Sequence, residues 1–185
     1  MDNTEFLDNY EKTLERGLLR VCSSAGLLPD ELIESPDINE MWDTYAKDYI
    51  ADAVENFNDY SEAAIAWAGF LGMGVAHNWD SHWTFHRHDS YSSYYGRRGW
   101  DDMDEHILHG VLGLDLDSAE AKKISNTLQN CALAALGLIR HEGIETQTAL
   151  GFYVLARTYG VLYRIGESME LHRLGYRKVA LKPEG

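Results

Sequence analysis

The segment from Ala63 to Trp79 is almost wholly apolar over 17 residues, and no other feature of the chain constrains its fold as strongly. A helix that is apolar on every side must be surrounded by other helices or by lipid. Three glycines interrupt the segment, His77 and Asp80 close it, and 17 residues are few for crossing about 30 Å of hydrocarbon. The segment therefore predicts a buried helix at the centre of a helical protein.

Small residues line one face of this predicted central helix. Glycine inside a helix is less favourable than alanine by about 1 kcal/mol, so Gly69, Gly72 and Gly74 need a compensating contact, such as the close approach of a second helix. Ala156 and Gly160, in the last predicted helix, offer a matching groove. A kink at the glycines would explain them equally well, so both interpretations stay open. The line itself consists of Ala64, Ala68, Gly72 and Ala76, which lie four residues apart.

Apolar residues elsewhere recur at three- and four-residue steps, which is the periodicity of a helix. No segment alternates with a period of two, and the chain has only 3 prolines, so no strand is required. We predict an all-α, single-domain bundle of about six helices over residues 1–174, with a buried, Gly/Ala-rich central helix, followed by a short basic C-terminal tail over 175–185. The predicted helices cover residues 3–25, 36–56, 61–86, 101–110 or 101–113, 118–143 and 146–174.

Several predicted helix ends carry specific signals. Asp37 and Glu40 are placed as a capping box, in which each side chain accepts a hydrogen bond from an otherwise free backbone N–H. Ser118 can cap the fifth helix in the same way. Gly26 and Gly143 supply the left-handed residue that commonly ends a helix.

Composition narrows the possible partners. The protein is acidic, with a formal net charge of -14, so it repels nucleic acid and anionic membrane surfaces. We expect neither as a partner. Basic residues cluster only near the C-terminus, and we interpret this cluster as a solvated tail. It consists of Arg173, Arg177, Lys178 and Lys182.

The cysteines indicate the cellular compartment in which the protein folds. Cys22 and Cys131 lie far apart and form no CxxC motif, unlike the cysteines of a disulfide-stapled secreted domain. The N-terminal residues show no secretion signal. We expect two reduced, buried thiols in a cytoplasmic protein.

Histidine and tryptophan concentrate in one stretch, from His77 to His109, which holds six of the 8 histidines and three of the 5 tryptophans. His82 and His86 are one helical turn apart and are expected to point into the core. Such a pair can bind a divalent transition metal, but two core histidines bonded to protein groups are the preferred interpretation.

A second group follows in the predicted fourth helix. Asp102, Glu105, His106 and His109 share an arc of that helix, and this arc is expected to face solvent because the apolar residues occupy the opposite side. A metal site becomes plausible only if the loop over residues 91–99 brings His82 and His86 to His106 or His109. A metal-bound water would then serve as nucleophile.

Two further sets of residues could bind ligands or partners. Arg97 and Arg98 lie beside Trp100 in an aromatic loop that suits a small anion, a planar ligand or, preferably, a subunit interface. The second set could line a small-molecule pocket between the third and sixth helices, although core packing is the preferred interpretation. It consists of Trp79, Trp83, Tyr159 and Tyr163.

The sequence specifies no reaction, because it contains no nucleophile elbow, Walker loop, dinucleotide fingerprint or HExxH motif. We therefore expect a non-enzymatic, cytoplasmic helical protein that works by binding and forms a homo-oligomer. Two alternatives remain: a metal-dependent hydrolase that uses the stretch from His77 to His109, and a helical protein that binds a small-molecule ligand. No cofactor is assigned.

Overall fold

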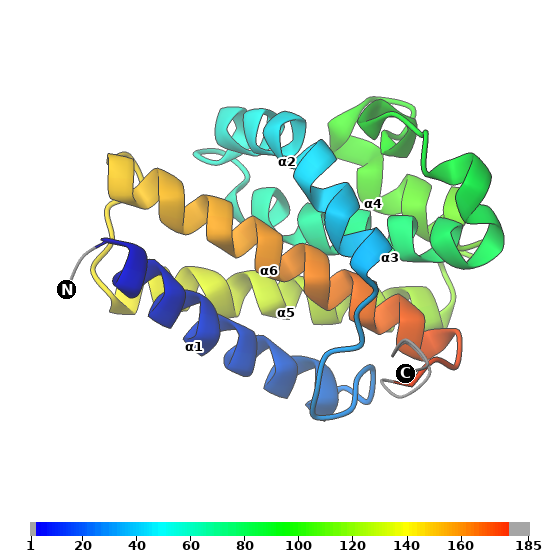
Figure 1. The fold of residues 1–185 in the computed structure, drawn as a ribbon, viewed down its shortest axis with the longest axis horizontal. Coiled ribbons are helices and arrows are strands. Elements are labelled where there is room, and N and C mark those ends of the chain that lie inside the picture. Colours follow the sequence, from blue (N-terminus) through cyan, green and yellow to red (C-terminus); the bar gives the residue numbers. More distant parts are fainter. Residues whose placement is uncertain (1–2, 178–185) are drawn as a thin grey trace.

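The fold is all-α over residues 3–177, which are the residues that the computed structural model of the protein describes (Figure 1). This confirms the predicted fold class. Within that range the chain forms six α-helices and three shorter helical segments, and its one β-bridge, between Gly96 and Gly99, is isolated. In chain order the elements are α1 (Asn3–Ser24), α2 (Pro36–Asn56), α3 (Ser61–His86), the 3-10 turns η1 (Tyr91–Tyr94) and η2 (Trp100–Asp102), α4 (Met103–Glu105), the π-helix η3 (His106–Val111), α5 (Ala119–His141) and α6 (Ala149–Arg173).

Helices α3 and α6 form the axis of the bundle and share its most extensive contact. Helices α1 and α5 run along one side of α6 in Figure 1, and α2 lies on the other side. Every residue from Ala64 to Ala76 is buried except Trp67, as expected for a helix that is apolar on all sides. None of the helices within residues 3–177 combines the length and apolarity needed to cross a membrane.

Glycines let the backbones of α3 and α6 touch. A Cβ atom on Gly166 would collide with the carbonyl oxygen of Gly69, and one on Gly72 would collide with the carbonyl oxygen of Tyr163. Close helix approach is therefore the correct explanation of Gly69 and Gly72, whereas Gly74 leaves room for the side chains of Tyr94 and Ile107. The predicted partner groove was wrong, because Gly160 faces Trp42, whose Nε1 would lie 3.3 Å from a Cβ atom there.

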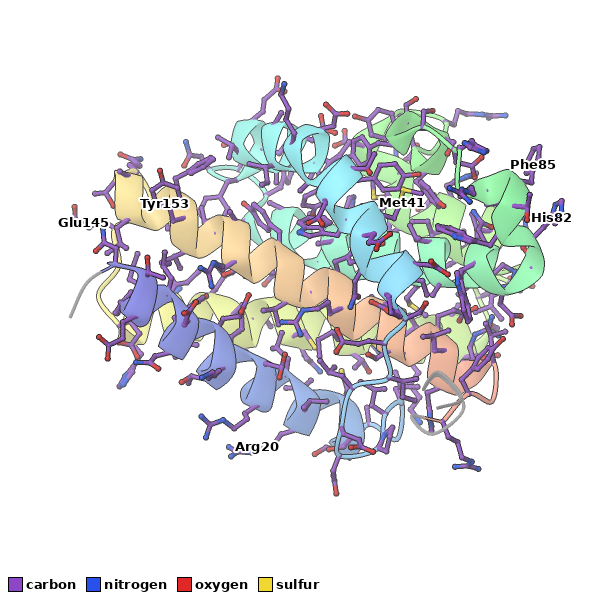
Figure 2. The ribbon with its side chains drawn as sticks, in the orientation of Figure 1. Arg20, Met41, His82, Phe85, Glu145 and Tyr153 are labelled. Carbon is purple, nitrogen blue, oxygen red and sulfur yellow. The ribbon has the colours of Figure 1, made fainter. Side chains whose placement is uncertain are left out.

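The regular course of α3 is broken at His82, whose backbone is non-helical (φ -164°, ψ 78°). By this point the helix has left the core, and Asp80, Ser81 and Phe85 are exposed. Figure 2 shows His82 and Phe85 at the outer end of the molecule. The helical periodicity that predicts which residues of α3 face the core therefore does not apply after His82.

The predicted fourth helix is instead a succession of a 3-10 turn, one α-helical turn and a π-helix. Hydrogen bonds from residue i+5, such as Leu112 N to Ile107 O at 2.8 Å, define the last part. Tight packing fixes its start, because a Cβ atom on Gly96 would collide with Asp102. A single regular helix over this segment was the wrong prediction.

The helix-end predictions have mixed outcomes. Ser118 caps α5, since its Oγ accepts from Ala121 N at 3.1 Å, and Gly26 and Gly143 adopt the predicted positive φ of 76° and 67°. The capping box was wrong: Ser35 is the N-cap of α2 and makes no side-chain cap bond.

The predicted basic tail falls partly outside the described residues, which end at 177. Arg173 belongs to the last turn of α6. Tyr176 packs on Trp79, with ring centroids 5.5 Å apart, and donates a hydrogen bond to Asp80 Oδ1 at 2.6 Å. The start of the segment predicted to be a solvated tail is therefore part of the packed structure.

Candidate functional site

The histidine pair of α3 does not point into the core. His82 is exposed and stacks on Phe85, with ring centroids 6.0 Å apart and planes inclined by 4°. His86 is half-buried, and its Nδ1 lies 2.7 Å from Asp89 Oδ2. The inward orientation was wrong because the backbone break at His82 rotates the last turn of α3 away from the phase set by the buried part.

The second histidine group stays separate from the first. The ring of His106 lies over Gly110, and the exposed His109 donates from Nδ1 to Leu114 O at 3.2 Å. Within residues 3–177 no three side chains of His, Cys, Asp or Glu are grouped so that they could share a metal ion. The hydrolase hypothesis thus has no assembled centre there.

The aromatic loop packs against its own chain. Trp100 is buried, and its carbonyl oxygen accepts from Trp67 Nε1 at 2.9 Å. Arg98 forms a two-pronged pair with Asp102, with Nε–Oδ2 at 3.0 Å and Nη2–Oδ1 at 2.8 Å, and these hydrogen bonds lower the pKa of that carboxyl. Of Arg97, Arg98 and Trp100, only the two arginines are exposed, so the Trp100 side chain is not available to a second subunit.

The four aromatic residues considered as a pocket do not converge. Tyr159 and Tyr163 are fully buried, and Tyr163 donates to Ile38 O at 2.7 Å. Trp79 lies against the chain beyond α6 and donates to Asp37 Oδ2 at 3.1 Å, and Trp83 is half-buried. For the two tyrosines, core packing was the correct interpretation.

A different cavity lies where α3, α5 and α6 meet the turn after α1. Its volume is about 300 Å³. One part of its wall is apolar, and another carries charged groups at the ends of α5 and α6. We call it the α3–α5–α6 pocket, and it is lined by Gly26, Leu27, Met73, Glu120, Ile124, Met169, His172 and Arg173.

A buried carboxylate fixes the guanidinium group of this pocket. The Glu170 side chain is 0% exposed, and Arg173 binds it with two hydrogen bonds, Nε–Oε1 at 2.6 Å and Nη2–Oε2 at 2.8 Å. These bonds raise the pKa of Arg173. His77 Nδ1 lies 2.8 Å from Glu170 Oε2. Because a carboxylate oxygen accepts, His77 donates to it from Nδ1.

Charged groups of both signs lie at the edge of the pocket. The Lys123 ammonium lies near Gly26, which lines the pocket, since its Nζ is 3.6 Å from the place where a Cβ atom of Gly26 would stand. Arg173 Nη1 lies 3.5 Å from Glu120 Oε1, and the Glu120 side chain is 50% exposed. That contact is long and open to water, so it is weak.

A second buried carboxyl lies one helical turn before Glu170 and faces the start of α2. Glu167 Oε2 accepts from Ser35 N at 2.7 Å, whereas Oε1 has no hydrogen-bond partner among the described residues. Burial raises the pKa of Glu167 to about 9. This side chain is therefore neutral at pH 7, unlike a carboxylate bound by a guanidinium.

Sequence reasoning missed these residues for identifiable reasons. Arg173 was grouped with the basic tail, and His77 was counted in the histidine cluster but given no partner. Glu167 and Glu170 lie in a stretch of α6, residues 166–171, that is buried on every side. Two glutamates inside such a stretch, followed by Arg173 three residues after Glu170, were the signal that could have found the site.

A larger hollow of about 410 Å³ lies between α1 and α5. It exists because Gly17 and Gly137 have no side chains to fill it. Its polar residues, Thr13, Arg16, Arg20 and His141, are all exposed, and none is fixed by a buried partner as Arg173 is. The α3–α5–α6 pocket is thus the stronger candidate site.

Comparison with protein-family models, with curated proteins and with solved structures gives no match for this chain. Function is therefore argued from the site itself.

Proposed function

We propose that the protein is a non-enzymatic, cytoplasmic binding protein that holds a small amphipathic anion in the α3–α5–α6 pocket. The proposal rests on one observation, the presence in a single cavity of an apolar wall and a guanidinium fixed by a buried carboxylate. Glu170 takes the Nε–Nη2 edge of Arg173 and fixes the group, and the Nη1 donors remain for a carboxylate or phosphate oxygen of a ligand. None of the eight lining residues is a serine, threonine or cysteine that could act as a nucleophile.

The size and composition of the pocket limit the ligand. Pockets of about 300 Å³ are at the small end of those that bind small molecules. Leu27, Met73 and Ile124 would contact an apolar body, and the anionic group would lie between Arg173 and Lys123 in place of Glu120. Short fatty acids and small aryl carboxylates have this form.

The cytoplasmic part of the proposal rests on the thiols. Cys22 and Cys131 are free and buried, with their sulfur atoms 3.7 Å apart. A protein that matures in an oxidising compartment would tend to join such close thiols.

Calorimetric titration with hexanoate and with hexanamide tests the binding function. Hexanoate is expected to bind at one site, and hexanamide about fivefold more weakly because it lacks the charge that Arg173 recognises. Lys123→Ala should weaken hexanoate by a similar factor and leave hexanamide unchanged. Lys122→Ala, an exposed neighbour on the same helix, is the matched control. Absence of saturable binding of either compound would contradict the proposal.

Self-association is a second candidate function, supported by exposed apolar side chains at one end of the bundle. Val54 is 47% exposed, Phe152 44% and Tyr153 52%. Val54 and Phe152 line a hollow of about 250 Å³. Aromatic residues are enriched at subunit interfaces, so this end replaces the Trp100 loop as the proposed contact.

Sedimentation velocity tests this second candidate. Phe152→Ser should shift the chain toward monomer, whereas Phe85→Ser, which is 63% exposed at the opposite end (Figure 2), should not. Glu145 lies beside this surface, so added salt should strengthen the association by screening like charges. A wild-type monomer at all concentrations rules this candidate out and leaves ligand binding unaffected.

A further inference from the structure

Sulfur atoms gather at one place in the interior. The chain has 2 cysteines and 5 methionines. Both cysteines contact each other, with Cys22 Sγ 3.7 Å from Cys131 Sγ, and Cys22 Sγ is 4.0 Å from Met169 Sδ. Met73 lines the same pocket as Met169. Three helices, α1, α5 and α6, thus bring their sulfur-bearing side chains together.

The two separations from Cys22 are compatible with sulfur atoms that share one metal ion. Two sulfur ligands that each lie about 2.3 Å from one ion are about 3.8 Å apart when the angle between them is near tetrahedral. The distances of 3.7 and 4.0 Å in this cluster agree with that value. Thiolates and thioethers are soft donors, and together they favour Cu(I) over harder divalent ions. We infer that Cys22, Cys131 and Met169 form a binding site for one Cu(I) ion.

Charge balance in the site comes from proton release. Cys22 and Cys131 are both free cysteines, and a thiol must lose its proton to ligate a metal ion. Binding converts Cu⁺ and two thiols into a bis-thiolate complex of charge −1 and two released protons, and Met169 adds a neutral thioether. No electron is transferred in this step, so it needs no oxidant or reductant.

The α3–α5–α6 pocket provides the route to the site. Met169 lines the pocket on one side and contacts Cys22 on the other. Met73 adds a second thioether along the wall, so an ion can pass between sulfur donors without crossing purely hydrocarbon packing. The inference does not depend on the binding of a small anion in the pocket, because its ligands are sulfur atoms behind the pocket wall.

Competition with a colorimetric chelator tests the inference. Reduced protein is titrated without oxygen into the Cu(I)–bicinchoninate complex, and the loss of its colour gives the copper transferred. The wild type should remove one Cu(I) per chain. Met169→Leu, which conserves volume, and Cys131→Ser should each weaken binding by about tenfold or more. Met103→Leu, another buried methionine, is the matched control and should bind as the wild type does.

Two results would overturn the inference. One is a wild type that removes no copper from the complex. The other is a folded Met169→Leu or Cys131→Ser variant that binds Cu(I) as tightly as the wild type, which would assign the copper to surface histidines. Circular dichroism reports folding, and Met169→Leu keeps the test decisive if Cys131→Ser does not fold.

Discussion

At Glu170 the chain buries a negative charge and supplies it with three donors from two side chains, Arg173 and His77. Removing either partner would leave the fully buried Glu170 carboxylate with less compensation for its charge. The same carboxylate holds Arg173 in position beside the pocket. Stability and ligand recognition therefore depend on one residue.

Glu170→Ala should lower the free energy of unfolding by about 2 kcal/mol. The reason is that Arg173 and His77 lose their shared acceptor. Urea denaturation at pH 7 measures the loss. Glu120→Ala is the control, since its 3.5 Å contact with Arg173 is half-exposed and should contribute less than about 1 kcal/mol. Equal effects of the two substitutions would contradict the assignment of the buried charge.

The raised pKa of Glu167 predicts that the stability of the folded chain decreases as the pH rises, whereas a carboxylate paired with a cation stabilises the fold more at higher pH. Its pKa is raised to about 9 in the folded chain from 4.5, so the folded state keeps a proton that the unfolded state loses. Stability from this group is complete below about pH 4.5 and falls as the pH rises toward 9.

Glu167→Gln tests this dependence, because glutamine resembles the neutral acid at every pH. Between pH 6 and pH 8 the wild type should lose up to about 1.4 kcal/mol per pH unit relative to the variant. When the free energies of unfolding of the two proteins are subtracted, the contributions of the other titrating groups cancel. A difference that does not change with pH would show that Glu167 is ionised in the folded chain.

Among single residues, those whose role follows from local geometry could be predicted from the sequence. Ser118 caps α5 and Gly143 ends it through local hydrogen bonds and φ alone. The orientation of His82 could not be predicted, since it depends on where packing ends and the helix breaks. Glu170 shows the same limit, because its partner His77 lies 93 residues away.

Among the elements, α3 and α6 form the contact on which the bundle is built. The small residues of α3 correctly predicted close approach, but not which residues of α6 come close. That choice depends on the register between two helices far apart in sequence, and Gly166 rather than Gly160 meets the α3 backbone.

Gly166→Ala should destabilise the protein by about 3 kcal/mol, because the added methyl group collides with backbone that cannot move alone. Gly137→Ala is the matched control. A Cβ atom there meets no atom within 4 Å, so the better helix propensity of alanine should stabilise the protein by up to about 1 kcal/mol. Thermal unfolding of both variants measures the contrast, and two similar melting temperatures would contradict the close packing of α3 on α6.

The long helices could be predicted almost to the residue, whereas the segment from Tyr91 to Val111 could not. Helices such as α2 and α5 carry their apolar period and end signals locally. The 3-10 and π segments depend on remote contacts, such as Tyr91 OH donating to Asp52 Oδ2 at 2.8 Å. Turns whose shape is imposed by other elements leave no period in the sequence.

For the whole molecule, the proposed site exists only where three helices and one turn meet. Its residues come from four separate parts of the chain, Gly26–Leu27, Met73, Glu120–Ile124 and Met169–Arg173. No local pattern combines them, and the concentration of histidine and tryptophan from His77 to His109 drew attention to a neighbouring region. Of that stretch, only His77 belongs to the group of charged residues around Glu170.

Methyl NMR of the methionines tests the central claim, that the α3–α5–α6 pocket binds a small anion. Met73 and Met169 line the pocket, whereas Met41 and Met103 do not, so the methyl signals report binding by position. Single Met→Leu variants assign the signals. Titration with hexanoate should shift the signals of Met73 and Met169 along saturating curves with one common affinity and leave Met41 and Met103 in place. Unchanged Met73 and Met169 signals, or shifts confined to Met41 and Met103, would contradict the account.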